Sequence, residues 1–261
     1  MNKRPIITTI LLATCMLLLT AGMLLLTGCG HPKIVGVKSL TAANVAAQSK
    51  VENYHIDGTI NMEIELDYEE LQALSEFVEP KLPVEVTIAA DAGTETAHVT
   101  TKAGVSVFGK SVDVQKGDYY VDMKQGYQDQ QLSLKEIAGG LAIVGKTVLD
   151  SAAFAETDEA YSLTMPAEKA GDLIADMHLL DCVDLGIADI RDVTVEGGQI
   201  VYNVDKETLL IQSIQLQDVN VRGKGVYEDS SVSLKSPINA SFQFSRYNEL
   251  DEKDYAIPEE K

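Results

Sequence analysis

Residues able to carry out chemistry are few and scattered in this chain. Its histidines share no metal-ligand spacing with one another or with Cys182; they are His31, His55, His98 and His178. A loose acidic cluster lacks the spacing of a calcium loop; it comprises Asp181, Asp184, Asp189 and Asp192. No phosphate-binding glycine loop or nucleophile elbow is present in the sequence. Among 40 acidic residues, adjacent pairs such as Glu69 and Glu70 arise by chance and do not indicate a glycosidase. We therefore predict a protein that is not an enzyme and uses no cofactor or metal.

Cys29 is the residue with the most specific chemical signature. Lys3 and Arg4 precede an apolar run from Ile6 to Leu26, which is typical of a signal peptide. The run ends in Leu26-Thr27-Gly28-Cys29, which resembles the lipobox of bacterial lipoproteins. The lipobox implies that residues 1–28 are removed and that the Cys29 thiol accepts a diacylglycerol. The alternative is an uncleaved transmembrane helix, because about 21 apolar residues can span a bilayer.

Net charge restricts the partners of the mature chain. The formal charge is −19, and removal of residues 1–28 takes away Lys3 and Arg4 but no acid, which gives −21. Such acidity excludes a general nucleic-acid binder and argues against electrostatic adhesion to anionic lipid. The lipid on Cys29 would then hold the protein at the extracytoplasmic face of the cell membrane. Cys15 leaves with the signal peptide, so Cys182 is a lone thiol that we expect to be buried.

The first half of the mature chain predicts a tether, a short helix and an antiparallel meander. Residues 29–40 have no clear periodicity, and Thr41–Val51 has helical spacing. Strict alternation from Tyr54 to Leu66 indicates a strand with one buried face, and a short helical turn should follow Asp67. Four more strands are expected, with turns at glycines; the strands are 84–90, 95–102, 105–114 and 119–123, and the turns are at Gly93, Gly104 and Gly117.

The second half predicts two helices and a run of strands. Ser133 and Glu136 form a capping-box pattern before an apolar stripe that continues to Val148. A strand at 160–165 leads into a second helix after Pro166. Strands then follow to Phe244, with Gly197-Gly198 as a hairpin turn. The links of the meander are too short for parallel crossovers, so we expect one α+β domain over residues 41–261 with an antiparallel sheet.

The order of these elements is similar to that of a known family. Three stretches contribute to the likeness: Val51–Gly58, Val204–Leu209, and Tyr247-Asn248-Glu249 leading to Ile257-Pro258. Together they resemble bacterial lipoproteins of the LolA/LppX type, especially the uncharacterised members from Gram-positive bacteria. The resemblance covers residues 41–261. It implies an open antiparallel sheet curled into a half-barrel around a few helices, with an apolar concave face that holds acyl chains.

This resemblance implies a membrane-anchored lipoprotein of the cell envelope that binds or carries a hydrophobic ligand such as a lipid. Apolar residues of the long strand and of the two helical stripes are candidates for the cavity lining; they are Ile60, Met62, Ile64, Ile137, Leu141, Leu173 and Met177. The alternative is a non-enzymatic interaction or structural module with a filled core. Its acidic outer face or an exposed sheet edge would then meet another envelope protein.

Overall fold

A computed structural model describes residues 32–67, 81–107, 110–124, 132–184, 187–227 and 230–258. The chain divides into two compact units, Met1–Lys33 and Ile34–Lys261. The fold described below is that of the second unit. Cys29 and the helical turn predicted after Asp67 lie outside the described residues.

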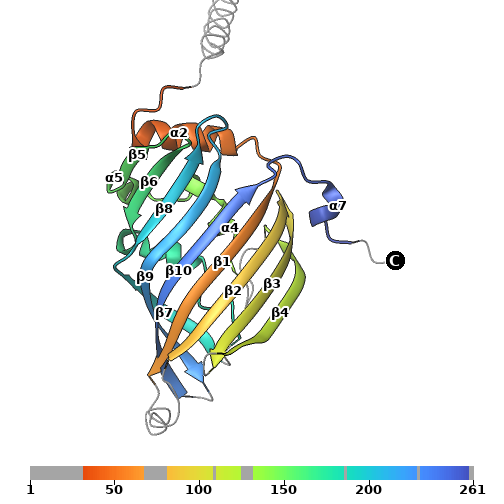
Figure 1. The fold of residues 1–261 in the computed structure, drawn as a ribbon, viewed down its shortest axis with the longest axis vertical. Helices are drawn as coiled ribbons and strands as arrows, with labels where there is room; N and C mark the ends of the chain where they lie inside the picture. The colour runs from red at the N-terminus through yellow and green to blue at the C-terminus, as the bar shows by residue number, and fades with distance from the viewer. Residues whose placement is uncertain are drawn as a thin grey trace, which may run out of the picture. The chain divides into compact units, whose positions relative to one another are not determined.

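A single antiparallel sheet of ten strands forms the body (Figure 1). Its strand order is β4-β3-β2-β1-β10-β9-β8-β6-β5, and β7 also pairs with β9. The sheet does not close, so β4 and β5 are its edges. The strands are β1 (Asn53–Asp67), β2 (Lys81–Gly93), β3 (Thr96–Val107), β4 (Lys110–Asp122), β5 (Ala153–Glu156), β6 (Ala160–Pro166), β7 (Ala188–Glu196), β8 (Gln199–Asp205), β9 (Ile211–Tyr227) and β10 (Ser230–Ser245).

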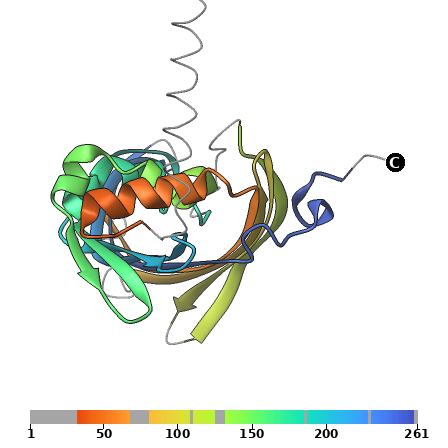
Figure 2. The same cartoon turned by 90° about the horizontal axis from the view of Figure 1, so that it is seen from above.

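Short helical segments lie on the inner side of the curved sheet (Figure 2). They are α2 (Val37–Gln48), α4 (Leu134–Ala138), η1 (Gly140–Ala142), α5 (Lys146–Asp150), η2 (Ala167–Ala170) and α6 (Gly171–Asp176), while α7 (Glu252–Tyr255) follows the last strand. Apolar side chains from these segments and from the inner sheet face form one buried cluster. The prediction of an open antiparallel sheet with a few helices is therefore confirmed.

The alternation predicted for the first long strand is realised in β1. Ile56, Ile60 and Ile64 point into the core, whereas Asp57 and Asn61 are exposed. Successive side chains of a strand point to opposite faces, so a period of two places every apolar residue on one side. β1 is an interior strand of the sheet, because it pairs with β2 on one side and with β10 on the other.

The first helix begins earlier than its sequence pattern indicated. α2 starts at Val37, within the segment expected to be a tether, and its Leu40 has no exposed surface. Ile34 is already buried. The packed body therefore begins at Ile34, and the second half of the segment predicted as a tether belongs to it.

Two glycines expected to mark turns lie inside strands. Gly104 is in β3 beside a β-bulge, where the register with β4 shifts between Ala103 and Gly104. Gly117 is in β4, where a Cβ atom would lie 2.6 Å from Oγ1 of Thr101. Glycine in a strand interior often marks a bulge or a close approach rather than a reversal. The three strands predicted between residues 95 and 123 are consequently two long ones.

The helix predicted from Leu134 to Val148 is divided into α4, η1 and α5. Gly140 adopts a φ of +58°, in the left-handed region that favours glycine. Ser133 precedes α4 as expected, but its side chain makes no capping hydrogen bond, so the predicted capping box is wrong.

Gly197 and Gly198 lie between two strands that do not pair with each other, so the predicted hairpin turn is wrong. β7 and β8 instead follow one another along β9, with Glu196 opposite Asn220 and Gln199 opposite Gln217. A Cβ atom on Gly198 would lie 2.6 Å from the carbonyl oxygen of Asp218, so the backbone passes too closely for a side chain. The glycine pair thus carries the chain across an irregularity in β9 and does not form a hairpin.

Among the described residues, no helix is long and apolar enough to span a membrane.

Candidate functional site: a polar hollow on the outer sheet face

The residues predicted to line a hydrophobic cavity are brought together in the core. Ile60 from β1, Ile137 from α4 and Met177 after α6 have 0% exposed surface. The remaining ones are Met62, Ile64 and Leu141, which are also buried, and Leu173, which is half-buried. A side chain without accessible surface borders no space that could hold a water molecule. Around Ile60, Ile137 and Met177 the core is therefore closely packed.

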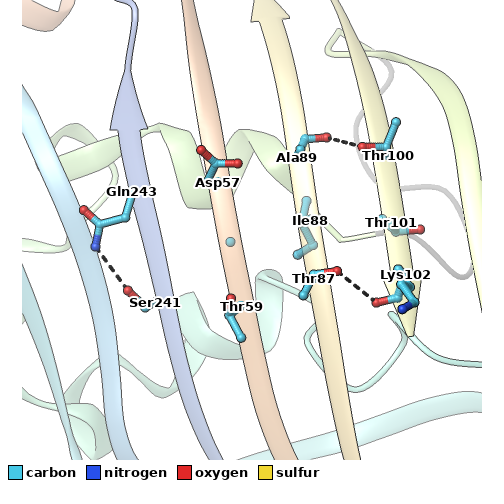
Figure 3. Close-up of a pocket in the computed structure, with 11 residues that line it drawn as sticks. Asp57, Thr59, Thr87, Ile88, Ala89, Thr100, Thr101, Lys102, Ser241 and Gln243 are labelled. Carbon is cyan, nitrogen blue, oxygen red and sulfur yellow. Dashed lines mark hydrogen bonds between the residues drawn. The ribbon is translucent and has the colours of Figure 1, made fainter. Parts of the chain in front are cut away.

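A hollow of about 450 Å³ lies instead on the outer face of the sheet, across β10, β1, β2 and β3 (Figure 3). Side chains from two neighbouring cross-strand rows line it. One row contains Ser241, Thr59, Thr87 and Lys102. The other contains Gln243, Asp57, Ala89 and Thr100. Most of these side chains are short, and the twisted sheet therefore leaves a depression between its longer ones.

Hydroxyl and amide groups in the hollow are only weakly engaged with the protein. Thr87 donates to the carbonyl oxygen of Lys102 at 3.5 Å, and Thr100 donates to that of Ala89 at 3.4 Å (Figure 3). Gln243 donates from Nε2 to the Ser241 hydroxyl at 3.2 Å. Hydroxyl hydrogen bonds are ordinarily 2.5–3.0 Å long, so the two threonine bonds are weak. These groups can rotate to bind a ligand at small cost.

A row of imidazole and carboxylate side chains borders the hollow. The His55 ring lies between two carboxylates, with Nδ1 2.7 Å from Asp91 and Nε2 3.2 Å from Asp57. His98 lies 2.7 Å from Asp118 through Nε2 and stacks on the ring of Tyr120. His55 is on the solvent-facing side, as the alternation of its strand predicts, and His98 lies on the same face of the sheet. These fixed groups make the border rigid, whereas the hydroxyls of the hollow remain adjustable.

A second hollow, of about 230 Å³, lies between α6 and β7. Apolar side chains such as Ile174, Leu179 and Val221 form part of its lining, and Asp181 and Asp192 contribute carboxylates. Its other lining residues include Asp176, His178 and Ile190. Of the four clustered aspartates noted in the sequence, Asp181 and Asp192 line this hollow. Within the described ranges, no group of three histidine, cysteine or acidic side chains is placed to hold a metal ion.

Cys182 is buried among apolar side chains, as expected for a lone thiol in this sequence context. Its Sγ donates a hydrogen bond to the carbonyl oxygen of Leu179 at 2.8 Å. Burial raises the pKa of this thiol to about 12, because a thiolate would lose its hydration in the core. Since only the thiolate is a strong nucleophile, Cys182 is suited to packing and not to catalysis.

The sequence placed Asp57 and Thr59 on a solvent-facing strand surface but did not identify the hollow. Ser241 and Gln243 join them only through the pairing of β1 with β10. Polar alternation in the last strand was the available signal, since Ser241 and Gln243 lie between the buried Ala240, Phe242 and Phe244. It indicates a wet face, but it does not say which other strand shares that face.

Comparison with known proteins assigns no family to the chain. No family model matches it, and no curated protein matches it. Among solved structures, it is similar to a bifunctional dehydratase-cyclase domain from ambruticin biosynthesis, with a TM-score of 0.16 and 11% identity over 79% of this chain and 81% of that one. It is also similar to an N-terminal dehydratase from the difficidin assembly line, with a TM-score of 0.14 and 8% identity over 78% and 83% of the two chains. For GphF dehydratase 1 the TM-score is 0.14, with 10% identity over 78% and 84%. Scores this low carry no argument about fold or activity.

Proposed function

We propose that this protein is a lipid-anchored envelope lipoprotein that acts as a non-enzymatic binding module through the outer face of its sheet. The observation that carries the proposal is a contrast between the two faces. The inner face is covered by packed side chains around Ile60, Ile137 and Met177. The outer face offers the 450 Å³ hollow with its weakly engaged hydroxyl and amide groups.

Carriage of a hydrophobic ligand is the second candidate, and one feature of the cover favours it. The segments that cover the inner face around α4 are only three to five residues long. Helices this short are not stable alone and depend on packing. Gly139 and Gly145 lie between them, and Gly140 begins η1, so this part of the cover can move at lower cost than one continuous helix. A carrier would open here and admit an acyl chain.

Site-specific photocrosslinking in cells tests the outer-face proposal. A benzoylphenylalanine at Thr87, inside the hollow, is expected to yield one discrete adduct. The same group at Ser233, an exposed outer-face position of β10 outside the hollow, provides the matched control. Adding Thr59→Arg should fill the hollow and abolish the Thr87 adduct. Equal adducts at both positions, or an adduct that survives Thr59→Arg, would refute the proposal. Saturable binding of a fluorescent fatty acid by the purified lipoprotein would instead favour the carrier.

The anchor has its own test. Cys29→Ala removes the thiol that would accept the lipid. Mass spectrometry of the membrane fraction should then find the added mass of a diacylglycerol on an at least tenfold smaller fraction of the variant than of the wild-type protein. Replacement of Cys182 by alanine is the control, because it removes a buried thiol and should leave acylation unchanged. An unacylated wild-type protein would show that the lipobox interpretation is wrong.

A further inference from the structure

Helix α2 turns polar side chains toward the body. Asn44 is buried and donates from Nδ2 to the carbonyl oxygen of Leu209 at 2.9 Å. Oγ1 of Thr41 and Oε1 of Gln48 are also buried, and neither has a hydrogen-bond partner in the described part of the chain. Only Leu40 gives this side of the helix a large, fully buried apolar side chain.

The opposite side of α2 is apolar where a soluble helix is usually polar. Ala42 and Ala46 are exposed, and Val45 is 39% exposed. Val35, just before the helix, is 71% exposed. Figure 2 looks onto this end of the body, and α2 lies across it. Val37, Ala43 and Ala47 pack with Leu40 against the core, so α2 has apolar side chains on its inner side and also on its outer side.

Charge on this segment also departs from the rest of the chain. Residues 29–51 contain Lys33, Lys38 and Lys50 and no acid, in a chain of net charge −19. All three lysines are exposed. Among the nearest carboxylates, Asp150 forms an ion pair with Lys146 at 2.9 Å. Asp205 is held by the amides of its own turn. Glu52 and Glu207 are exposed, as is Glu249 next to Asn248, whose Nδ2 donates to the Lys50 carbonyl oxygen, and these acids reduce the local positive charge.

We infer that the outer side of α2 rests on the bilayer that holds the lipid on Cys29. Val35 and Val45 would enter the interface, and Lys38 and Lys50 would contact anionic headgroups. The inference depends on the proposed acylation of Cys29. From Cys29 to Ile34 the chain can extend by at most about 17 Å, so the first residues of the body must stay close to the lipid. The two acyl chains of the diacylglycerol would keep the protein at the membrane, and the basic patch would orient α2 toward its surface.

Fluorescence of the acylated protein on vesicles tests this orientation. Val45→Cys is labelled with nitrobenzoxadiazole, and Ser241→Cys on the outer sheet face is the matched control. On vesicles of 70% phosphatidylcholine and 30% phosphatidylglycerol, lipid-borne nitroxide should quench the label at position 45 and leave that at 241 unaffected. Each lysine near an anionic surface contributes about fivefold to binding. In the double variant Lys38→Glu, Lys50→Glu, the fraction of molecules with α2 on the vesicle surface should therefore fall by about tenfold or more.

Two results would distinguish failure of the contact between α2 and the membrane from failure of the lipid anchor. If the labelled protein sediments with the vesicles and position 45 is no more quenched than position 241, the anchor holds but the inference about α2 is wrong. If the wild-type protein does not sediment with vesicles at all, the proposed anchor has failed. Quenching at 45 that is equal on pure phosphatidylcholine vesicles would overturn the role of the lysines.

Discussion

Replacing Ile60 by alanine should lower the free energy of unfolding by about 3–4 kcal/mol. Ile60 lies in the middle of β1 with no exposed surface, opposite Val86 of β2 and Ala240 of β10. Truncation removes buried methyl groups and leaves a void that the paired strands cannot close. Denaturant unfolding of the purified protein, followed by far-ultraviolet circular dichroism, would measure the loss.

The same experiment bears on the two candidate functions. Thr87→Ala, on the exposed face of the neighbouring strand, is the control and should change stability by no more than about 0.5 kcal/mol. A loss below about 1 kcal/mol for Ile60→Ala would mean that Ile60 borders accessible space, as in a carrier. A full loss that a fatty acid does not restore is the result expected of a filled core.

Alkaline pH should destabilise the protein more than any single core substitution. Burial raises the pKa of Cys182 and of Tyr54 to about 12, from ordinary values of 9.0 and 10.0. Burial also raises the pKa of Tyr202 and of Tyr247. The folded state therefore keeps these protons at a pH where the unfolded chain has lost them. Because the unfolded state binds fewer protons above pH 9, stability falls as the pH rises from about 9 toward 12.

One pKa unit corresponds to about 1.4 kcal/mol, so the four groups together should remove on the order of 5 kcal/mol between pH 9 and pH 11. Denaturant unfolding at four pH values would give the slope. Tyr54→Phe combined with Tyr202→Phe removes two of the titrating hydroxyls and should make the slope clearly shallower. The hydroxyl of Tyr202 has no hydrogen-bond partner among described residues, so its removal leaves no polar group unpaired. An unchanged slope in the double variant would refute this origin of the pH dependence.

Local patterns in the sequence were sufficient where one physical cause dominates. In β1 every second residue is apolar over thirteen positions, and only a half-buried strand satisfies that pattern. The strand was accordingly predicted to within one residue at each end. α2 was predicted less well, because its inner face contains Asn44 and Gln48 while Val45 is exposed. Small and apolar residues occur on both sides of this helix, so its pattern does not define where the helix begins or which side is buried.

Glycines were misinterpreted for a related reason. A glycine in the sequence is compatible with a turn, a bulge or a close contact, and the choice depends on neighbours that are distant in the chain. Gly104 belongs to a bulge, and Gly117 has too little space for a side chain beside Thr101. The candidate site was out of reach in the same way, because Asp57 meets Gln243 only after strands 186 positions apart have paired in the right register.

The pairing of β1 with β10 also determines when this protein can fold. The first and last long strands are neighbours at the middle of the sheet, with His55 opposite Ser245. A chain emerging amino-terminus first from a ribosome or a translocation channel therefore leaves one edge of β1 without its partner strand until nearly the whole chain has emerged. Contacts this far apart in sequence form slowly, because a long loop must close before they contribute. Folding as a whole is thus postponed to the end of synthesis or export, and loss of the last strand would leave two separate half-sheets.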